Sequence, residues 1–353
     1  PPPPRLSKRG TYIRPEGEIH RAFSPAVVLK QVIIASDQGV IKELNADTKK
    51  TKLVAKIPLV IEEGDLYGWT NYIVTGKHKR TDKHYNCIID MKTRRLKGII
   101  KKQGLLWHIR DFAIYSEKNS ILVVSPMRGR VVYTQKVDHT FTRQVKSSHS
   151  KQYILFNDNN EIVELILPEW AIALLFVTTQ PQKGERKKSI LNFRTITELK
   201  SGLVPNYLNG KTVYYHTKNS IGCLDFKHNE TLWTYDLPKA FTKVHNPEEQ
   251  SGVLVYLVSS TKPPYQGKVL AIDKKNGKLL WSTNSFAYKQ YKPVIYKKLV
   301  LAPGKDGDLV FYDLKSGEEI FEFPLGGQFT TPYIEHSSIY VQTPEKLFRF
   351  DYR

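Results

Sequence analysis

The side chains that could perform chemistry in this chain are scattered rather than grouped. Of the ten histidines, only His78 and His84 approach the spacing of metal ligands. Both stand among four cations that would oppose a divalent ion, and no cysteine or carboxylate completes a ligand set. Serine and histidine occur without a nucleophile signature, and no glycine-rich phosphate loop follows a strand and opens a helix. We therefore expect no metal ion and no catalytic residue.

The cysteines and aspartates also favour structural roles. Cys87 and Cys223 are the only two cysteines, so the sequence codes no disulfide framework, although a bridge between them stays open. A calcium site would need about six to eight oxygen ligands. The conspicuous aspartates recur at one offset of a repeated motif, which is typical of side chains that bond to nearby backbone in turns: Asp90, Asp225, Asp273 and Asp313.

A repeated hairpin must position these residues. Its clearest copy covers residues 268–281, where apolar residues alternate on either side of Asn276-Gly277, a pair that supplies positive φ in hairpins. Aspartate, then glycine or asparagine, then an aromatic residue recur at matched offsets in residues 220–233 and 308–321. Weaker copies cover residues 40–53 (with Asp47), 86–96, 129–135 and 346–351. We assign the missing fourth unit to residues 171–177, a polar loop and residues 190–193.

The spacing of the repeats predicts the architecture. Anchors at 47, 90, 135, 177, 225, 273, 313 and 351 lie 38 to 48 residues apart, close to the roughly 40–45 residues of a four-stranded propeller blade. The last unit ends before its fourth strand, and residues 18–23 form a spare strand that could complete it. The prediction is an all-β fold: a single eight-bladed β-propeller over residues 18–353, closed by an N-terminal strand. Residues 1–17 are predicted to be an extended, proline-rich tether.

The chain is strongly basic. It carries 54 Lys+Arg against 34 Asp+Glu in 353 residues, a formal net charge of +20. Such an excess favours anionic partners, which include nucleic acid, acidic protein surfaces and lipid headgroups. An AT-biased genome would produce the same excess without any functional meaning, so both interpretations stay open at this point. No stretch reaches the roughly 18 apolar residues of a membrane span.

From Ala271 to Trp281 the hairpin resembles the pyrroloquinoline-quinone-like β-propeller repeat. Eight blades with an N-terminal closing strand resemble the BamB family of outer-membrane protein assembly lipoproteins. Quinoprotein dehydrogenases, which share the repeat, resemble one another in an adjacent cysteine pair and a carboxylate cluster around calcium. This chain has neither, so we expect a scaffold rather than an enzyme, with no cofactor. The repeat offset of Trp233 and Trp281 predicts packing between blades.

Two basic loops are the candidate partner-binding residues. The insertion at residues 180–188 is not needed to close a hairpin, and longer loops more often carry function. It contributes Lys183, Arg186, Lys187 and Lys188. The loop between the second and third strands of another unit contributes Lys77, Lys79, Arg80 and Lys83.

The function we expect is a non-enzymatic scaffold for protein–protein interaction in a cell-envelope complex. The resemblance implies a periplasmic, outer-membrane-associated location, near a membrane and among protein partners with acidic surfaces. The alternative is a basic structural subunit of a ribonucleoprotein or other large assembly. Single-strand nucleic-acid binders usually interleave aromatic with basic residues. Neither basic loop does so, and this favours the scaffold.

Overall fold

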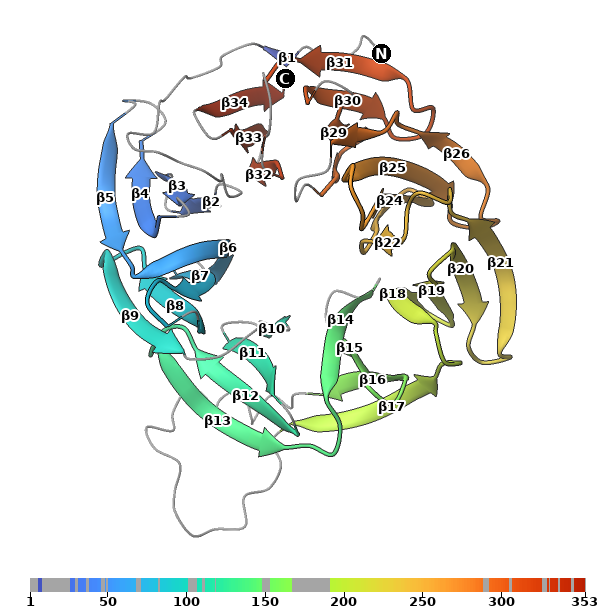
Figure 1. Ribbon diagram of the computed structural model, residues 1–353, viewed down its shortest axis with the longest axis horizontal. Helices are drawn as coiled ribbons and strands as arrows, with labels where there is room; N and C mark the ends of the chain where they lie inside the picture. Colours follow the sequence, from blue (N-terminus) through green and yellow to red (C-terminus); the bar gives the residue numbers. More distant parts are fainter. Residues whose placement is uncertain are drawn as a thin grey trace. The chain divides into compact units, whose positions relative to one another are not determined.

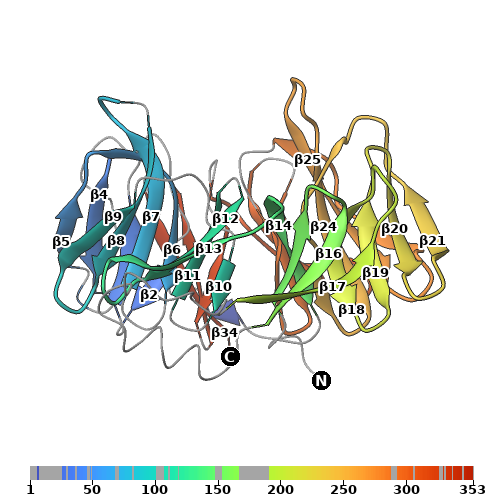
Figure 2. The ribbon, with the colours of Figure 1, turned by 90° about the horizontal axis from the view of Figure 1, so that it is seen from below.

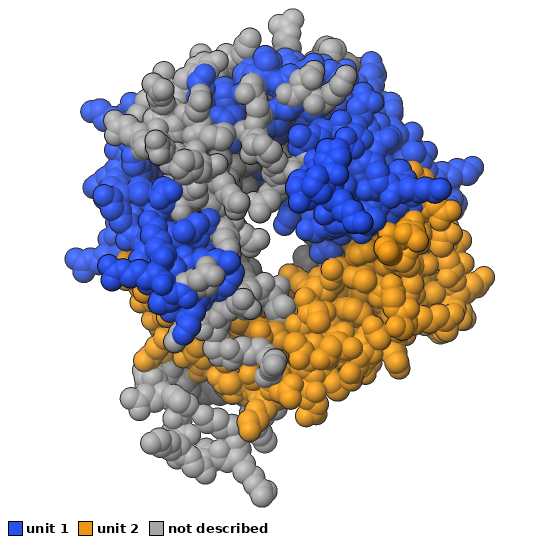
Figure 3. Space-filling model, in the orientation of Figure 1, with its two compact units in different colours: residues 1–85, 89–95, 237–353 blue, residues 86–88, 96–236 orange. Residues whose placement is uncertain are grey.

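A computed structural model describes the chain at residues 6–7, 26–28, 31–35, 38–45, 48, 50–67, 71–81, 83–100, 107–109, 112–117, 119–147, 153–166, 191–287, 292–304, 307–325, 329, 331–335, 337–343 and 346–352. These residues form strands and turns without any helix, so none of their segments is a helix long and apolar enough to span a membrane. The fold is an all-β, eight-bladed β-propeller, as predicted. The chain divides into two compact units (Figure 3).

The first unit comprises residues 1–85, 89–95 and 237–353. Its sheets follow chain order from strand to strand (Figure 1). Two sheets come from the N-terminal part, and the boundary between the units crosses the second: β2 (Ala26–Val28), β3 (Gln31–Ala35), β4 (Val40–Leu44), β5 (Thr51–Lys56); β6 (Leu59–Tyr67), β7 (Asn71–His78), β8 (His84–Asp90), β9 (Arg95–Ile100).

The C-terminal part of the first unit supplies three more sheets. In the first of these, β23 also pairs with β24, and β27 pairs with β25. Their strands are β22 (Lys243–Val244), β23 (Glu248–Gln250), β24 (Val253–Ser259), β25 (Gln266–Asp273), β26 (Leu279–Ser282), β27 (Phe286–Ala287); β28 (Val294–Tyr296), β29 (Leu299–Pro303), β30 (Leu309–Asp313), β31 (Glu319–Phe323); β32 (Tyr333–Glu335), β33 (Ser338–Gln342), β34 (Leu347–Tyr352), β1 (Leu6–Ser7).

The second unit comprises residues 86–88 and 96–236. Two of its sheets are joined by a short parallel pairing of β14 with β18. The strands are β10 (Trp107–Ile109), β11 (Phe112–Glu117), β12 (Ser120–Ser125), β13 (Arg130–Lys136); β14 (Phe141–Ser147), β15 (Tyr153–Asn157), β16 (Glu161–Ile166), β17 (Asn192–Glu198); β18 (Val204–Asn209), β19 (Thr212–His216), β20 (Ser220–Asp225), β21 (Glu230–Asp236).

Apolar residues of neighbouring sheets form the cores. In the first unit, Phe311, Phe323 and Phe350 lie in one buried cluster, and the rings of Phe323 and Phe350 meet edge to face at 4.8 Å between centroids. Val32 of the β2–β5 sheet packs with Tyr340 of the β32–β34 sheet, so the first and last sheets of the chain are neighbours. Burial of such side chains contributes roughly 1.5–3 kcal/mol each before the entropic cost of ordering them.

An N-terminal strand pairs with the outer edge of the last sheet, and it comes from an earlier segment than the one predicted. Leu6 pairs with Tyr352 and Ser7 with Asp351, which puts β1 on the free edge of β34. These two residues fall within the segment predicted as a tether, whereas residues 18–23 lie outside the described residues. The sequence could not distinguish the two segments, because a pairing this short leaves almost no pattern.

The fourth sheet corrects the predicted strand boundaries. The partner of β17 is β16, with a ladder from Glu161↔Glu198 to Ile166↔Asn192. Residues 171–177, which we predicted as this partner, lie outside the described residues. Glu164 lies inside β16. Arg194 stands opposite Glu164 in the ladder and forms an ion pair with it, so the acidic residue is tolerated in a nearly buried position.

The turn residue of the first sheet also differs from the prediction. The Asn45 Oδ1 atom accepts the Thr48 N–H at 2.8 Å, and the Asn45 N–H reaches Lys50 O at 3.0 Å. In the clearest repeat, Asp273 makes the same five-residue backbone contact with Lys278. Asn45 therefore occupies the aspartate position, since an asparagine side chain presents the same oxygen to the turn as an aspartate. Asp47, which we predicted there, lies outside the described residues. In the third sheet Ser125 stands there and uses only its backbone carbonyl.

Candidate partner-binding surface

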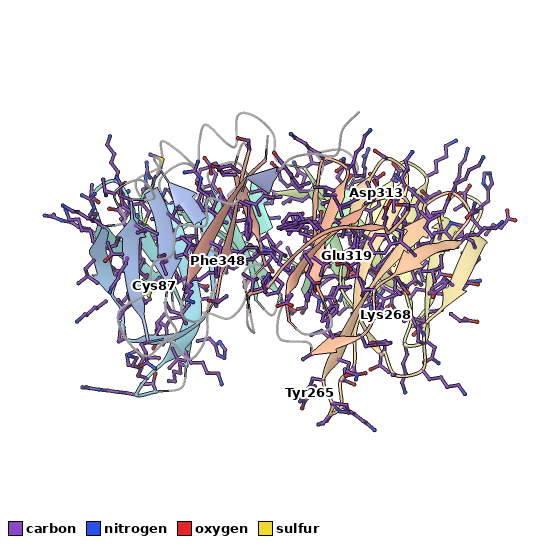
Figure 4. The ribbon with its side chains drawn as sticks, turned by 90° about the horizontal axis from the view of Figure 1, so that it is seen from above. Cys87, Tyr265, Lys268, Asp313, Glu319 and Phe348 are labelled. Carbon is purple, nitrogen blue, oxygen red and sulfur yellow. The ribbon has the colours of Figure 1, made fainter. Side chains whose placement is uncertain are left out.

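The recurring aspartates are turn residues, as predicted. In each of the four turns, one carboxylate oxygen accepts the backbone N–H groups of the second and third residues that follow, at 2.8–3.2 Å: Asp90, Asp225, Asp273 and Asp313. The Ser316 N–H bond is the largest of the effects that lower the pKa of Asp313. Figure 4 shows Asp313 at the end of its hairpin. These carboxylates are committed to local backbone bonds and do not converge on a ligand.

Trp281 packs against the neighbouring sheet, which confirms its predicted role. Its indole Nε1–H donates to Leu314 O at 2.9 Å, and its ring stacks on Tyr312 with 5.6 Å between centroids. Gly317 has φ +71°, and a Cβ there would lie 2.3 Å from Trp281 Cγ. Trp233 is buried and contacts Tyr214 of its own sheet at 5.9 Å.

Neither cysteine presents a reactive thiol. Cys87 and Cys223 are both buried and neither takes part in a disulfide, so they do not form the bridge that the sequence left open. Burial raises the pKa of the Cys87 thiol to about 11, which keeps it protonated near neutral pH. Within the described residues, no three His, Cys, Asp or Glu side chains come together in a way that could hold a metal ion.

The predicted basic loop is the connection between β7 and β8. Lys77 is half-buried on β7, whereas Lys79, Arg80 and Lys83 are exposed in the connection. The turn is fixed by backbone bonds from His78 N to Lys83 O at 2.8 Å and from Lys79 N to Pro58 O at 3.1 Å. The structure therefore presents three cations on a hydrogen-bonded hairpin.

His78 and His84 do not form a metal site within this hairpin. The His78 Nδ1 atom accepts the Arg80 N–H at 3.3 Å, and the His78 ring lies 5.6 Å from the Tyr85 ring. The Lys79 Nζ atom donates to Gln38 O at 2.9 Å. His78 thus shapes the turn that carries the cations.

The second predicted loop lies within residues 167–191, which connect β16 to β17. Lys183, Arg186, Lys187 and Lys188 are outside the described residues. The C-terminal end of this connection is held by Gln135 of β13, whose Oε1 accepts the Leu191 N–H at 3.1 Å and whose Nε2 donates to Leu191 O at 2.8 Å. The Leu191 side chain is buried in the adjoining core. A fixed anchor therefore precedes β17.

A third feature is the connection between β24 and β25. Tyr265 stands at its tip with 57% of its surface exposed. In Figure 4 Tyr265 lies at the far end of the hairpin, and Lys268 lies nearer the sheet. The sequence places Tyr265 in the loop of residues 261–266, and the structure adds that this side chain is exposed.

Comparisons with known proteins agree with this fold. A family model described as outer membrane protein assembly factor BamB matches residues 173–345. The crystal structure of BamB from Moraxella catarrhalis has a TM-score of 0.61 at 13% sequence identity, covering 98% of this chain and 100% of that one. The crystal structure of the computationally designed Ika8 protein has a TM-score of 0.64 at 10% identity, covering 96% of this chain and 98% of that one. No curated protein matches the sequence.

The hairpin turns and these comparisons define the class: the chain is a β-propeller of the pyrroloquinoline-quinone-like repeat type. Among propellers of this type it resembles the BamB family, whose model covers residues 173–345. The two structural matches show the fold alone, since both are distant in sequence.

Proposed function

We propose that this propeller is a non-enzymatic scaffold that binds a protein partner in a cell-envelope complex. The match to the outer membrane protein assembly factor supports a role in a cell-envelope complex and a periplasmic, outer-membrane-associated location. The formal net charge of +20 supports a partner with an acidic surface. Such a scaffold needs an interaction surface and no reacting group.

The arrangement of the acidic and sulfur-containing side chains supports a non-enzymatic role. In Asp273 and in Asp313, one carboxylate oxygen accepts hydrogen bonds from two backbone N–H groups of a turn. Cys87 and Cys223 are buried and separate. These features support a role without quinone or calcium, since the sequence has no adjacent cysteine pair and no cluster of metal-ligating side chains occurs within the described residues.

The connection of residues 167–191 is the observation that carries the proposal. The corresponding turns of the other sheets are short, for example 91–94 between β8 and β9 and 226–229 between β20 and β21. The ladder between β16 and β17 extends to Ile166↔Asn192, so strand pairing does not require the inserted residues. We infer that Lys183, Arg186, Lys187 and Lys188 bind the acidic surface of the partner.

The test is to change these four cations to serine in the full chain. Surface charges away from packed regions usually alter stability by less than about 0.5 kcal/mol, so the melting temperature should stay nearly constant. Affinity capture from native membranes should lose the partner, and raising the salt concentration should weaken capture by the wild type in the same way. The captured protein is identified by mass spectrometry.

The matched control removes four cations from the short turns instead: K227S, K275S, K278S and K315S, all exposed. The control has the same net charge as the test variant but leaves the insertion at residues 180–188 unchanged. It should therefore retain the partner. Equal capture by all three proteins at both salt concentrations would contradict the proposal. Capture that disappears after ribonuclease treatment would support the ribonucleoprotein alternative instead.

A further inference from the structure

Two hairpins of the first unit extend beyond their sheets on the same side. They are the β7–β8 and β24–β25 hairpins, and both connect the second and third strands of their sheets. Figures 2 and 4 show both tips projecting from the same face of this unit. The two tips therefore project in the same direction from this unit.

The β7–β8 hairpin carries the charge of this face. Lys79, Arg80 and Lys83 are exposed within five residues of chain. The backbone bond between His78 N and Lys83 O closes the turn, so the cations are displayed on a defined hairpin. Each Lys or Arg near an anionic membrane surface strengthens the electrostatic attraction to it.

The β24–β25 hairpin carries an aromatic side chain between two lysines. Tyr265 is exposed and follows Pro263 and Pro264, which have no polar side-chain atoms. Lys262 is exposed before it, and Lys268 follows on β25. A tyrosine combines an apolar ring with a polar hydroxyl, and such side chains concentrate at the boundary between lipid headgroups and acyl chains.

Hydrogen bonds hold this tip in place before any ligand arrives. The Ser260 Oγ atom accepts the Gln266 N–H at 2.9 Å and lies 3.0 Å from Pro264 O, to which it can donate. The Ser260 N–H donates to Gln266 O at 2.8 Å, and the Thr261 hydroxyl lies 3.0 Å from that of Thr242. A preorganised loop loses less conformational entropy on binding.

We propose that the tips of these two hairpins bind the surface of a membrane rich in anionic phospholipids. The cations of the β7–β8 tip meet phosphate groups, and Tyr265 inserts at the headgroup level. The corresponding β29–β30 connection contains an acidic residue, Asp308. Its Oδ1 atom accepts the Leu325 N–H at 3.2 Å, so this carboxylate is bonded within the fold. A lipid surface fits better than nucleic acid, because one aromatic side chain at the end of a hairpin offers no row of stacking platforms.

The experiment measures partitioning of the full chain onto vesicles by sedimentation. Vesicles of phosphatidylglycerol mixed with phosphatidylcholine should bind the protein, and vesicles of phosphatidylcholine alone should not. Raising the salt from ~0.1 M to ~1 M should weaken binding, since the Debye length falls from about 10 Å to about 3 Å. The K79S/R80S/K83S variant should lose about tenfold or more in partition coefficient.

A variant with the same net charge separates this site from the general basicity of the chain. K275S/K278S/K315S removes three exposed cations from the turns between third and fourth strands. Its partitioning should stay within about twofold of wild type, because these turns are not part of the proposed surface. Equal losses in the two triple variants would overturn the proposal and leave only non-specific charge.

Tyr265 is tested by Y265S, with M127S as control, since Met127 has the same exposed fraction, 57%, but lies in the second unit. Y265S should lower partitioning a few-fold and M127S should not. Failure of the wild type to bind anionic vesicles would overturn the proposal. If the K79S/R80S/K83S variant then lost a protein that the wild type captures from native membranes, the hairpins would be assigned to protein docking. The inference does not rest on the proposed function, because changing Lys183, Arg186, Lys187 and Lys188 to serine should leave vesicle binding intact.

Discussion

The side-chain amide of Gln135 brackets the backbone of Leu191 from both sides, accepting its N–H and donating to its carbonyl. The two residues are far apart in sequence, and between them lie three complete strands, β14, β15 and β16, and the basic connection. Tyr133, on the same strand, donates its hydroxyl to the same Gln135 Oε1 at 3.1 Å and so orients the amide. This clamp fixes the point where the connection enters β17.

Removing the clamp should therefore destabilise the second unit. Gln135→Ala should lower the free energy of unfolding by about 1–2 kcal/mol, because the N–H and carbonyl of Leu191 lose their partners next to a buried side chain. Gln135→Glu keeps the acceptor for the N–H and loses the donor to the carbonyl, so its cost should be similar or larger. Equilibrium urea denaturation measures both. A Q135A protein as stable as wild type would show that Leu191 is held by its side chain alone.

Trp281 provides the corresponding test in the first unit. Trp281→Phe retains an aromatic ring on Tyr312 but removes the donor to Leu314 O, which should cost about 1 kcal/mol. Trp281→Ala also removes the packing against Gly317 and should cost about 3 kcal/mol.

The control for Trp281 is its exposed neighbour, Leu280→Ser, which should change stability by less than about 0.5 kcal/mol. Urea denaturation should show the smallest loss of stability for L280S, a larger loss for W281F and the largest loss for W281A. Equal stability of W281F and W281A would contradict a role for the ring in packing between sheets.

Stability should depend on pH through His245. His245 lies between β22 and β23 in the chain, its backbone N–H donates to Leu257 O, and its ring Nε2 lies 3.4 Å from Ser259 Oγ. Burial, helped by the charges of Lys243 and Lys292, lowers the pKa of His245 to about 4. The unfolded chain therefore binds a proton that the folded chain does not between about pH 6.5 and pH 4, so the contribution of this residue is complete above pH 6.5 and is lost as the pH falls.

The expected loss for the wild type is about 1 kcal/mol between about pH 7.5 and pH 5.5, after allowance for partial exposure of the ring. Urea denaturation at the two pH values measures it. His245→Gln cannot take up a proton, so the difference in free energy of unfolding between the two pH values should shrink. This holds whether or not the glutamine amide replaces the contacts of the imidazole at the higher pH. An unchanged difference would show that another group titrates.

Sequence information was sufficient where the repeat is strong and local. Asp273 and Asp313 could be assigned to turns because their hydrogen bonds reach only the next few residues, and Trp281 could be assigned to packing from its offset. The fourth sheet could not be placed, because the acceptability of Glu164 in β16 depends on Arg194 across the ladder. The exposure of Tyr265 and the clamp of Gln135 on Leu191 depend on tertiary contacts that leave no local pattern.

The central claim is that this propeller acts by binding and not by quinone chemistry. The most direct test is a titration of the purified full chain with pyrroloquinoline quinone in the presence of calcium, followed by a dye-linked dehydrogenase assay. Since Cys87 and Cys223 are buried and apart, and the recurring aspartates are bonded within turns, the result should be no saturable quinone binding and no dye reduction above background. Saturable binding accompanied by quinone-dependent turnover would contradict the scaffold.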